Sequence, residues 1–181
     1  MKFSRSFRKL LAAAALVGMA TTFTGQPAEA ATVDAPLTVQ VDVAAACTVT
    51  TAAVNFGTYD ALGAQATTPL DATGNVAVEC ATGVAYFVRL GVGNDSLTGD
   101  PADPQRQMEH TTLAGNFMPY SLSYVAPGGT EWGDTAATSP AGSVGAGVGA
   151  TQNWPVFGRI APAIAAQAGQ YSDSVLATAE F

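Results

Sequence analysis

Residues 76–92 read V-A-V-E-C-A-T-G-V-A-Y-F-V-R-L-G-V, and this stretch decides the fold class. Apolar side chains occupy every second position within it, first at Val76, Val78 and Cys80 and then from Tyr86 to Val92. Successive side chains of a β-strand point to opposite faces, so an apolar period of two indicates a strand with one buried face. The stretch therefore predicts a pair of half-buried β-strands.

The same period recurs later in the chain. It appears at Tyr120, Leu122 and Tyr124, and again in the final run, which places these residues on one face: Tyr171, Val175, Ala177, Ala179 and Phe181. No segment after the first thirty residues keeps an apolar period of 3.6 over three turns, and turn-rich stretches such as 93–104 and 127–133 separate the runs. Short alternating strands with glycine-rich connections predict an all-β, antiparallel β-sandwich.

The first thirty residues have the pattern of an export signal. Lys2, Arg5, Arg8 and Lys9 precede an apolar run from Leu10 to Ala20, and Ala28-Glu29-Ala30 matches the small-x-small site of a signal peptidase. This apolar run is shorter than the about 20 residues that a membrane-spanning helix needs. We expect residues 1–30 to be a signal peptide, and the remaining chain, 31–181, to be an exported protein that does not insert into a lipid bilayer.

Loss of the signal would leave a strongly acidic protein. Residues 31–181 contain three arginines, no lysine and thirteen carboxylates, which gives a formal net charge of −10. Nucleic-acid binding depends on lysine and arginine neutralising phosphates, and attraction to anionic lipid headgroups depends on the same cations. The composition therefore argues against nucleic acid and membrane surfaces as partners.

The chain has two cysteines, Cys47 and Cys80. In an exported protein, which meets an oxidising compartment, the simplest expectation for such a pair is a disulfide. The alternative is two buried free thiols.

Few residues in the sequence carry catalytic or metal-binding chemistry. His110 is the single histidine and is expected on the surface, and no G-x-S-x-G turn presents a nucleophile. Residues 91–100 resemble one repeat of a calcium-binding β-roll, but that architecture works only in tandem, so a plain strand end followed by a turn is the other interpretation. We predict no catalytic, cofactor-binding or metal-binding residues, and hence a protein that is not an enzyme.

Both ends of the exported chain have unusual patterns. Residues 36–43 read P-L-T-V-Q-V-D-V, in which the aliphatic side chains form a row that we call the N-terminal row: Leu37, Val39, Val41 and Val43. The sequence stops at Phe181, inside its last alternating run. We expect a domain that lacks its final strand, which another segment must supply; the alternative is that residues 37–43 form an ordinary first strand of their own domain.

The exported chain resembles the spore coat U domain family, which includes the pilin subunits of archaic chaperone–usher fimbriae. The resemblance covers residues 32–181 and depends on an ordered set of short pieces: Cys47-Thr48-Val49, Phe56-Gly57-Thr58-Tyr59-Asp60, Val76 to Cys80, Tyr86 to Gly93, Arg106-Gln107-Met108, Tyr120-Ser121-Leu122, Trp132-Gly133, Val156-Phe157-Gly158-Arg159-Ile160 and Gly169-Gln170-Tyr171-Ser172-Asp173.

This resemblance implies an incomplete immunoglobulin-like β-sandwich that is completed by donor-strand exchange. Residues 31–45 would be an N-terminal extension, whose N-terminal row enters the groove of a neighbouring subunit, and residues 46–181 the sandwich domain. The implied partners are a periplasmic chaperone, an outer-membrane usher and neighbouring pilin subunits, and the implied product is a fimbria at the cell surface that supports adhesion and biofilm formation. Alternatives are a spore-coat-like or stand-alone secreted structural protein, or a surface adhesin, built on the same domain.

Overall fold

The computed structural model describes residues 30–140 and 150–181, and it divides the chain into two compact units, 1–41 and 42–181. In the first unit, the described residues 30–41 form neither helix nor strand, and all of their side chains are exposed. The proposed signal peptide lies outside the described residues except for Ala30. Within the described ranges, no helix is long and apolar enough to cross a membrane.

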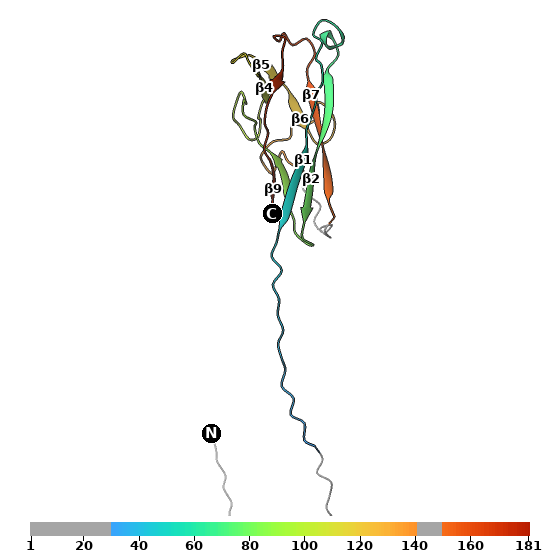
Figure 1. The fold of residues 1–181 in the computed structure, drawn as a ribbon, viewed down its shortest axis with the longest axis vertical. Coiled ribbons are helices and arrows are strands. Elements are labelled where there is room, and N and C mark those ends of the chain that lie inside the picture. The colour runs from blue at the N-terminus through green and yellow to red at the C-terminus, as the bar shows by residue number, and fades with distance from the viewer. Residues whose placement is uncertain (1–29, 141–149) are drawn as a thin grey trace, which may run out of the picture. The chain divides into compact units, whose positions relative to one another are not determined.

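The second unit is an antiparallel β-sandwich whose larger sheet has four strands (Figure 1). Their order is β1-β2-β7-β6, with bounds Cys47–Ala52, Leu70–Cys80, Gln152–Ile160 and Ser121–Ser123. The long strands β2 and β7 pair over nine residues, from Leu70 opposite Ile160 to Val78 opposite Gln152. Strand β1 lies at one edge of this sheet, because β2 is its only partner among the described residues.

The opposite layer consists of two smaller sheets. One pairs β3, Phe87–Leu90, with β9, Ala177–Glu180. The other has the order β5-β4-β8, with bounds Phe117–Pro119, Gln107–His110 and Tyr171–Ser172. The final stretch of the chain thus contributes β8 to one of these sheets and β9 to the other.

The core lies between the two layers and confirms the predicted alternation. Val76, Val78 and Cys80 of β2 pack in one cluster with Val88 and Leu90 of β3, and all five side chains are buried. Trp132 is fully buried in the same cluster, and its indole nitrogen donates to the Val88 carbonyl at 2.8 Å. The predicted all-β sandwich is therefore confirmed.

One expectation about an individual residue is wrong: His110 is buried at 6% exposure instead of lying on the surface. In the final run, Tyr171, Val175, Ala177 and Ala179 are partly buried, whereas Phe181, which follows the end of β9 at Glu180, is 59% exposed.

The burial of His110 follows from its contacts. The amides of Thr112 and Leu113 both donate to Nδ1 at 3.1 Å, and the Tyr171 ring packs edge-on with its centroid 5.0 Å away. With Nδ1 accepting, Nε2 is left to carry the proton of the neutral ring and faces the Ala168 carbonyl at 3.3 Å. The histidine fastens a loop onto β8 and is a structural residue.

Candidate functional site

The sandwich has two facing chain segments whose backbones lack partners in the backbone of another strand. Residues 53–59 follow β1, and residues 173–175 connect β8 to β9. In neither segment does the backbone form a hydrogen bond to the backbone of another described residue. Backbone N–H and C=O groups are strong donors and acceptors, and an unpaired sheet edge is a ready template for another strand. Both segments can therefore accept an additional strand.

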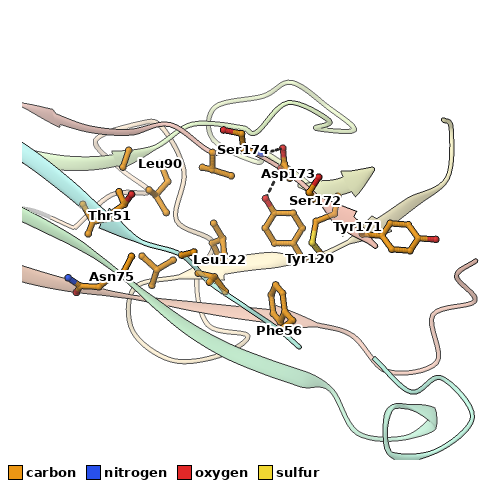
Figure 2. A pocket seen from close by; sticks show the side chains of 18 residues that line it. Thr51, Phe56, Asn75, Leu90, Tyr120, Leu122, Tyr171, Ser172, Asp173 and Ser174 are labelled. Atoms are coloured by element: carbon orange, nitrogen blue, oxygen red, sulfur yellow. Dashed lines mark hydrogen bonds between the residues drawn. The ribbon is translucent and has the colours of Figure 1, made fainter. Parts of the chain in front are cut away.

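An open groove with both apolar and polar lining residues lies between these two segments (Figure 2). One cavity of about 440 Å³ has Thr51 to Phe56 on one wall and Tyr171 to Ala177 on the other. A second cavity, of about 880 Å³, continues beside residues 53–61 and 166–171 and shares Phe56, Met108 and Tyr171 with the first. We call the two adjoining cavities the edge groove.

Side chains that would otherwise complete the core form the floor of the edge groove. Val54, Phe56, Met108 and Tyr120 line it and are only partly buried. The rings of Phe56 and Tyr120 meet edge to face, with centroids 6.3 Å apart. Apolar surface of this kind gains about 25 cal/mol for each Å² removed from water, so the floor favours an apolar occupant.

Two glycines explain how residues 54–56 lie so close to the large sheet. A Cβ atom at Gly158 of β7 would stand 2.7 Å from both the Val54 and the Phe56 side chains. A Cβ atom at Gly74 of β2 would stand 2.6 Å from the Ala52 carbonyl. The absence of these Cβ atoms lets the chain after β1 fold over the sheet and form one wall of the groove.

A polar cluster holds the other wall. The Asp173 carboxylate accepts from the Tyr120 hydroxyl at 2.6 Å and from the Asn94 amide at 2.8 Å. Burial, followed by the hydrogen bond to Asp173, raises the pKa of Tyr120 well above its usual range. The phenol therefore stays a hydrogen-bond donor at neutral pH.

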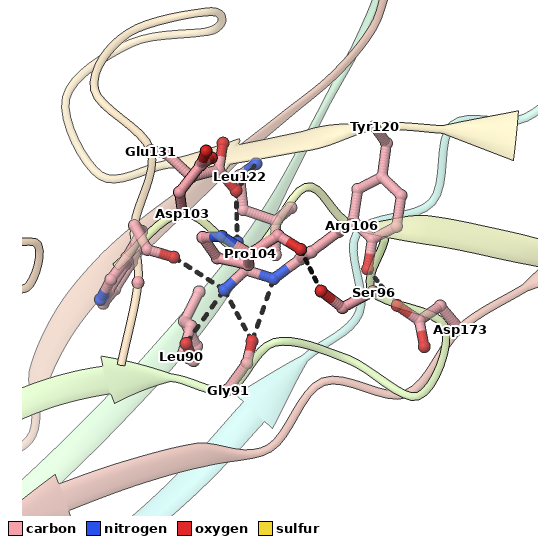
Figure 3. Close-up of polar contacts among 12 residues, drawn as sticks. Leu90, Gly91, Ser96, Asp103, Pro104, Arg106, Tyr120, Leu122, Glu131 and Asp173 are labelled. Carbon is pink, nitrogen blue, oxygen red and sulfur yellow. Dashed lines mark hydrogen bonds and ion pairs between the residues drawn. The ribbon is translucent and has the colours of Figure 1, made fainter. Parts of the chain in front are cut away.

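Arg106 supports this cluster from behind (Figure 3). Its side chain is fully buried and donates to the carbonyls of Leu90 at 2.9 Å, Gly91 at 2.7 Å and Trp132 at 2.7 Å, and it forms an ion pair with Glu131. Burial lowers the pKa of Arg106 and raises the pKa of Glu131, while the attraction within the pair opposes both shifts. The guanidinium satisfies the carbonyls at the end of β3, where a neighbouring strand would otherwise do so.

The side chains of the N-terminal row are exposed to solvent in the structure. Leu37, Val39, Val41 and Val43 are between 84% and 88% exposed, and residues 30–46 contain no strand. Their role as a donor strand stays a prediction.

The predicted disulfide is present. Cys47 and Cys80 are bonded to each other and stand directly opposite in the register of β1 and β2. The bridge therefore ties the edge strand β1 to its neighbour at the point where the sandwich begins.

Sequence reasoning missed most of the edge groove. Val54, Phe56 and Asp173 lie far apart in the chain and meet only in the fold. The alternation of Val54 and Phe56 was a usable signal, whereas no local pattern shows that Asp173 is their neighbour across a groove. Among residues 30–140 and 150–181, no group of three His, Cys, Asp or Glu side chains is placed to hold a metal ion, and Asn94 in the β-roll-like stretch binds Asp173 through its backbone.

The fold and the edge groove define an open-edged β-sandwich, a class of domain whose free edges can accept an extended segment. Residues 33–178 match the Spore Coat Protein U domain, and the chain belongs to that family. It is 30% identical over 177 residues to Protein U of Myxococcus xanthus, an alignment that covers 94% of this chain and 97% of that protein.

A solved structure shares the fold. It is the crystal structure of the CsuC–CsuE chaperone–tip adhesion subunit pre-assembly complex from the archaic chaperone–usher Csu pili of Acinetobacter baumannii. The TM-score is 0.53 at 21% sequence identity, and the match covers 77% of this chain and 40% of that chain. The chain thus spans less than half the length of this structural relative.

Proposed function

We propose that the protein is an exported structural subunit of a fibre assembled by the chaperone–usher route. The edge groove of one copy binds the N-terminal row of the next copy as the missing strand. The observation that carries this proposal is the edge groove itself, in which wall residues 53–59 and 173–175 form no backbone-to-backbone hydrogen bonds, in a chain whose residues 37–43 expose an alternating aliphatic row.

The energetics of such an exchange favour a durable contact. Burying four aliphatic side chains contributes about 6–12 kcal/mol before costs, at about 1.5–3 kcal/mol each. Ordering an extended segment takes back a large part of this gain. Main-chain hydrogen bonds to both walls add to the remainder, and a head-to-tail contact that does not close on itself generates an open filament.

The family and the fold support the partners in this proposal. The solved relative is a complex between a chaperone and a pilus subunit, so a periplasmic chaperone is the partner proposed to cover the edge groove before assembly. An outer-membrane usher and neighbouring subunits would follow, with the signal peptide of residues 1–30 directing export. Adhesion and biofilm formation are the proposed roles of the finished fibre at the cell surface, and no catalytic activity is part of the proposal.

A matched pair of substitutions tests this function. Val41→Asp places a carboxylate in the N-terminal row and should abolish polymer, because a buried unpaired charge is strongly unfavourable. Gln40→Asp adds the same charge on the opposite parity, which would face away from the groove, and should leave polymer formation within about twofold of wild type. Both are read by electron microscopy and by sedimentation of the exported protein. Normal fibres from Val41→Asp would refute the donor-strand role.

A second candidate function is a secreted coat-like structural protein that acts without fibre assembly. It is favoured by the end-to-end similarity to Protein U, which covers 97% of that relative. Deleting residues 31–45 separates the two functions. The deletion should leave an exported domain that cannot polymerise if the subunit proposal holds, and it should have no effect on assembly state if the domain acts alone.

A further inference from the structure

The C-terminal wall of the edge groove is the place where one continuous chain segment changes sheets. Residues 171–172 form β8 and pair with β4, whereas residues 177–180 form β9 and pair with β3. Residues 173–175 pair with neither strand, and the next backbone contact is from the Gly91 amide to the Leu176 carbonyl at 2.8 Å. Side-chain contacts must therefore hold the wall in its middle.

The Asp173 side chain provides those contacts from two directions (Figure 2). One oxygen accepts from the Asn94 amide at 2.8 Å and from the Ser174 amide at 2.6 Å, and the other accepts from the Tyr120 hydroxyl at 2.6 Å. The carboxylate thus links the turn after β3, which carries Asn94, to Tyr120, which precedes β6. Gly93, at φ +86°, leaves the space that the carboxylate fills, because a Cβ atom there would stand 2.3 Å from its oxygen.

Arg106 contacts one of these anchors, Tyr120, and also Gly91, which lies three residues before the other anchor, Asn94. Arg106 donates from its guanidinium to the Gly91 carbonyl and accepts from the Tyr120 amide through its own carbonyl at 3.0 Å. Arg106 is fully buried, so these contacts are shielded from water (Figure 3). Charge-assisted hydrogen bonds in such a setting are about twice as strong as neutral ones.

We propose that Asp173 is a positioning residue that keeps the edge groove open and ready for its occupant. It holds residues 173–175 back against Asn94 and Tyr120, so their free backbone faces the groove and cannot move across to pair with residues 53–55. This inference rests on the proposed function, in which the groove accepts the N-terminal row. Asp173 would then determine how fast and how tightly the edge groove binds that strand.

The test compares Asp173→Ala, Asp173→Asn and Tyr120→Phe with Asp134→Ala, all in the chain 31–181. Asp134 lies outside the edge groove, and its carboxylate forms no hydrogen bond to another described residue, so it is the matched control. The first measurement is amide hydrogen exchange at Asn94 and Ser174, whose amides donate to the Asp173 carboxylate, and it needs no occupant. The second is the uptake of a fluorescent peptide of residues 31–45. The chain is kept at high dilution, so that the N-terminal row of one copy does not occupy the edge groove of another.

Asp173→Ala should raise exchange at Asn94 and Ser174 and slow peptide uptake about tenfold or more. Asp173→Asn keeps an acceptor for Asn94 and should fall between Asp173→Ala and wild type. Asp134→Ala should match wild type in both measurements. Peptide uptake by Asp173→Ala at the wild-type rate would overturn the inference.

Two further outcomes keep the inference separate from the proposed function. If wild type takes up no peptide, the proposed function fails, while unchanged exchange in Asp173→Ala independently overturns the positioning of the wall. If Asp173→Ala does not fold, Tyr120→Phe decides, because it removes one hydroxyl and keeps the ring. Its uptake should slow about threefold, and an unchanged rate overturns the inference.

Discussion

At the scale of single residues, two of the three arginines in residues 31–181 have very different surroundings. Arg106 has no exposed surface and its donors are shared among three carbonyls and Glu131, whereas Arg159 forms an ion pair with Asp71 in which both side chains are about one third exposed. Buried pairs are costly to break because the remaining charge has no partner, while exposed pairs contribute about 0–1 kcal/mol. The two arginines therefore form a natural comparison.

Arg106→Met should lower the free energy of unfolding by about 3–5 kcal/mol, because it leaves Glu131 and three carbonyls without their donor. Arg159→Met removes the same formal charge from an exposed ion pair and should cost much less than Arg106→Met. Urea unfolding of the two variants measures the difference. Equal losses from both substitutions would contradict the role given to Arg106.

Tyr120 predicts a dependence of stability on alkaline pH. Its pKa is raised above the usual value near 10, first by burial and then by the bond to Asp173, so the folded state favours the neutral phenol. This contribution to stability is complete below pH 10 and is lost as pH rises toward the folded-state pKa, at up to about 1.4 kcal/mol per pH unit. Tyr120→Phe has no proton to lose and should flatten this part of the curve. Chemical unfolding at a series of pH values above 10 checks it, and equal slopes for both proteins would be evidence against it.

At the scale of the strands, β1 can separate from its sheet more easily than a central strand. It has one neighbour in the described sheet and forms the start of a groove wall. The disulfide between Cys47 and Cys80 compensates for this edge position, since it joins residues that face each other across β1 and β2. Its sequence separation of 33 residues is large enough for a substantial restriction of the unfolded chain.

Loss of this disulfide should lower the free energy of unfolding by about 3–4 kcal/mol. The double substitution Cys47→Ser with Cys80→Ser avoids reagents and can be compared with the reduced wild-type protein. Thermal melting of all three forms provides the measurement. A melting curve that does not change after confirmed reduction would contradict this expectation.

At the scale of the whole molecule, charge is the dominant feature. Three arginines against thirteen carboxylates give residues 31–181 a formal net charge of −10, and no lysine offsets it. Two copies that approach each other therefore repel over a distance set by the ionic strength. The proposed head-to-tail assembly must proceed against this repulsion.

Raising the salt concentration from about 0.01 M to about 0.15 M shortens the screening length from about 30 Å to about 8 Å. Because the repulsion between copies is then screened, polymer growth should accelerate severalfold. Light scattering from the purified chain at the two salt concentrations follows the growth. A rate that falls with salt would show that attraction between oppositely charged patches controls the encounter.

The sequence alone determined the class of fold and the covalent bridge of this protein. Alternation at Val76 to Cys80 and at Tyr86 to Leu90 is a local property of each strand, and the burial of these residues follows directly from it. The pairing of Cys47 with Cys80 needed only a count of cysteines. Belonging to the family likewise depends on short pieces in a fixed order along the chain.

Only the tertiary structure decided where the edge groove lies and which residues form its walls. Residues 53–59 and 173–175 are more than a hundred positions apart, and their facing backbones are a product of sheet order that no local pattern encodes. The burial of His110 and Arg106 has the same origin, because partners from distant loops surround them. The apolar periodicity of a sequence shows which face of a single strand is buried. A groove depends instead on how strands from distant parts of the chain are arranged and on where the two layers lack a strand between them.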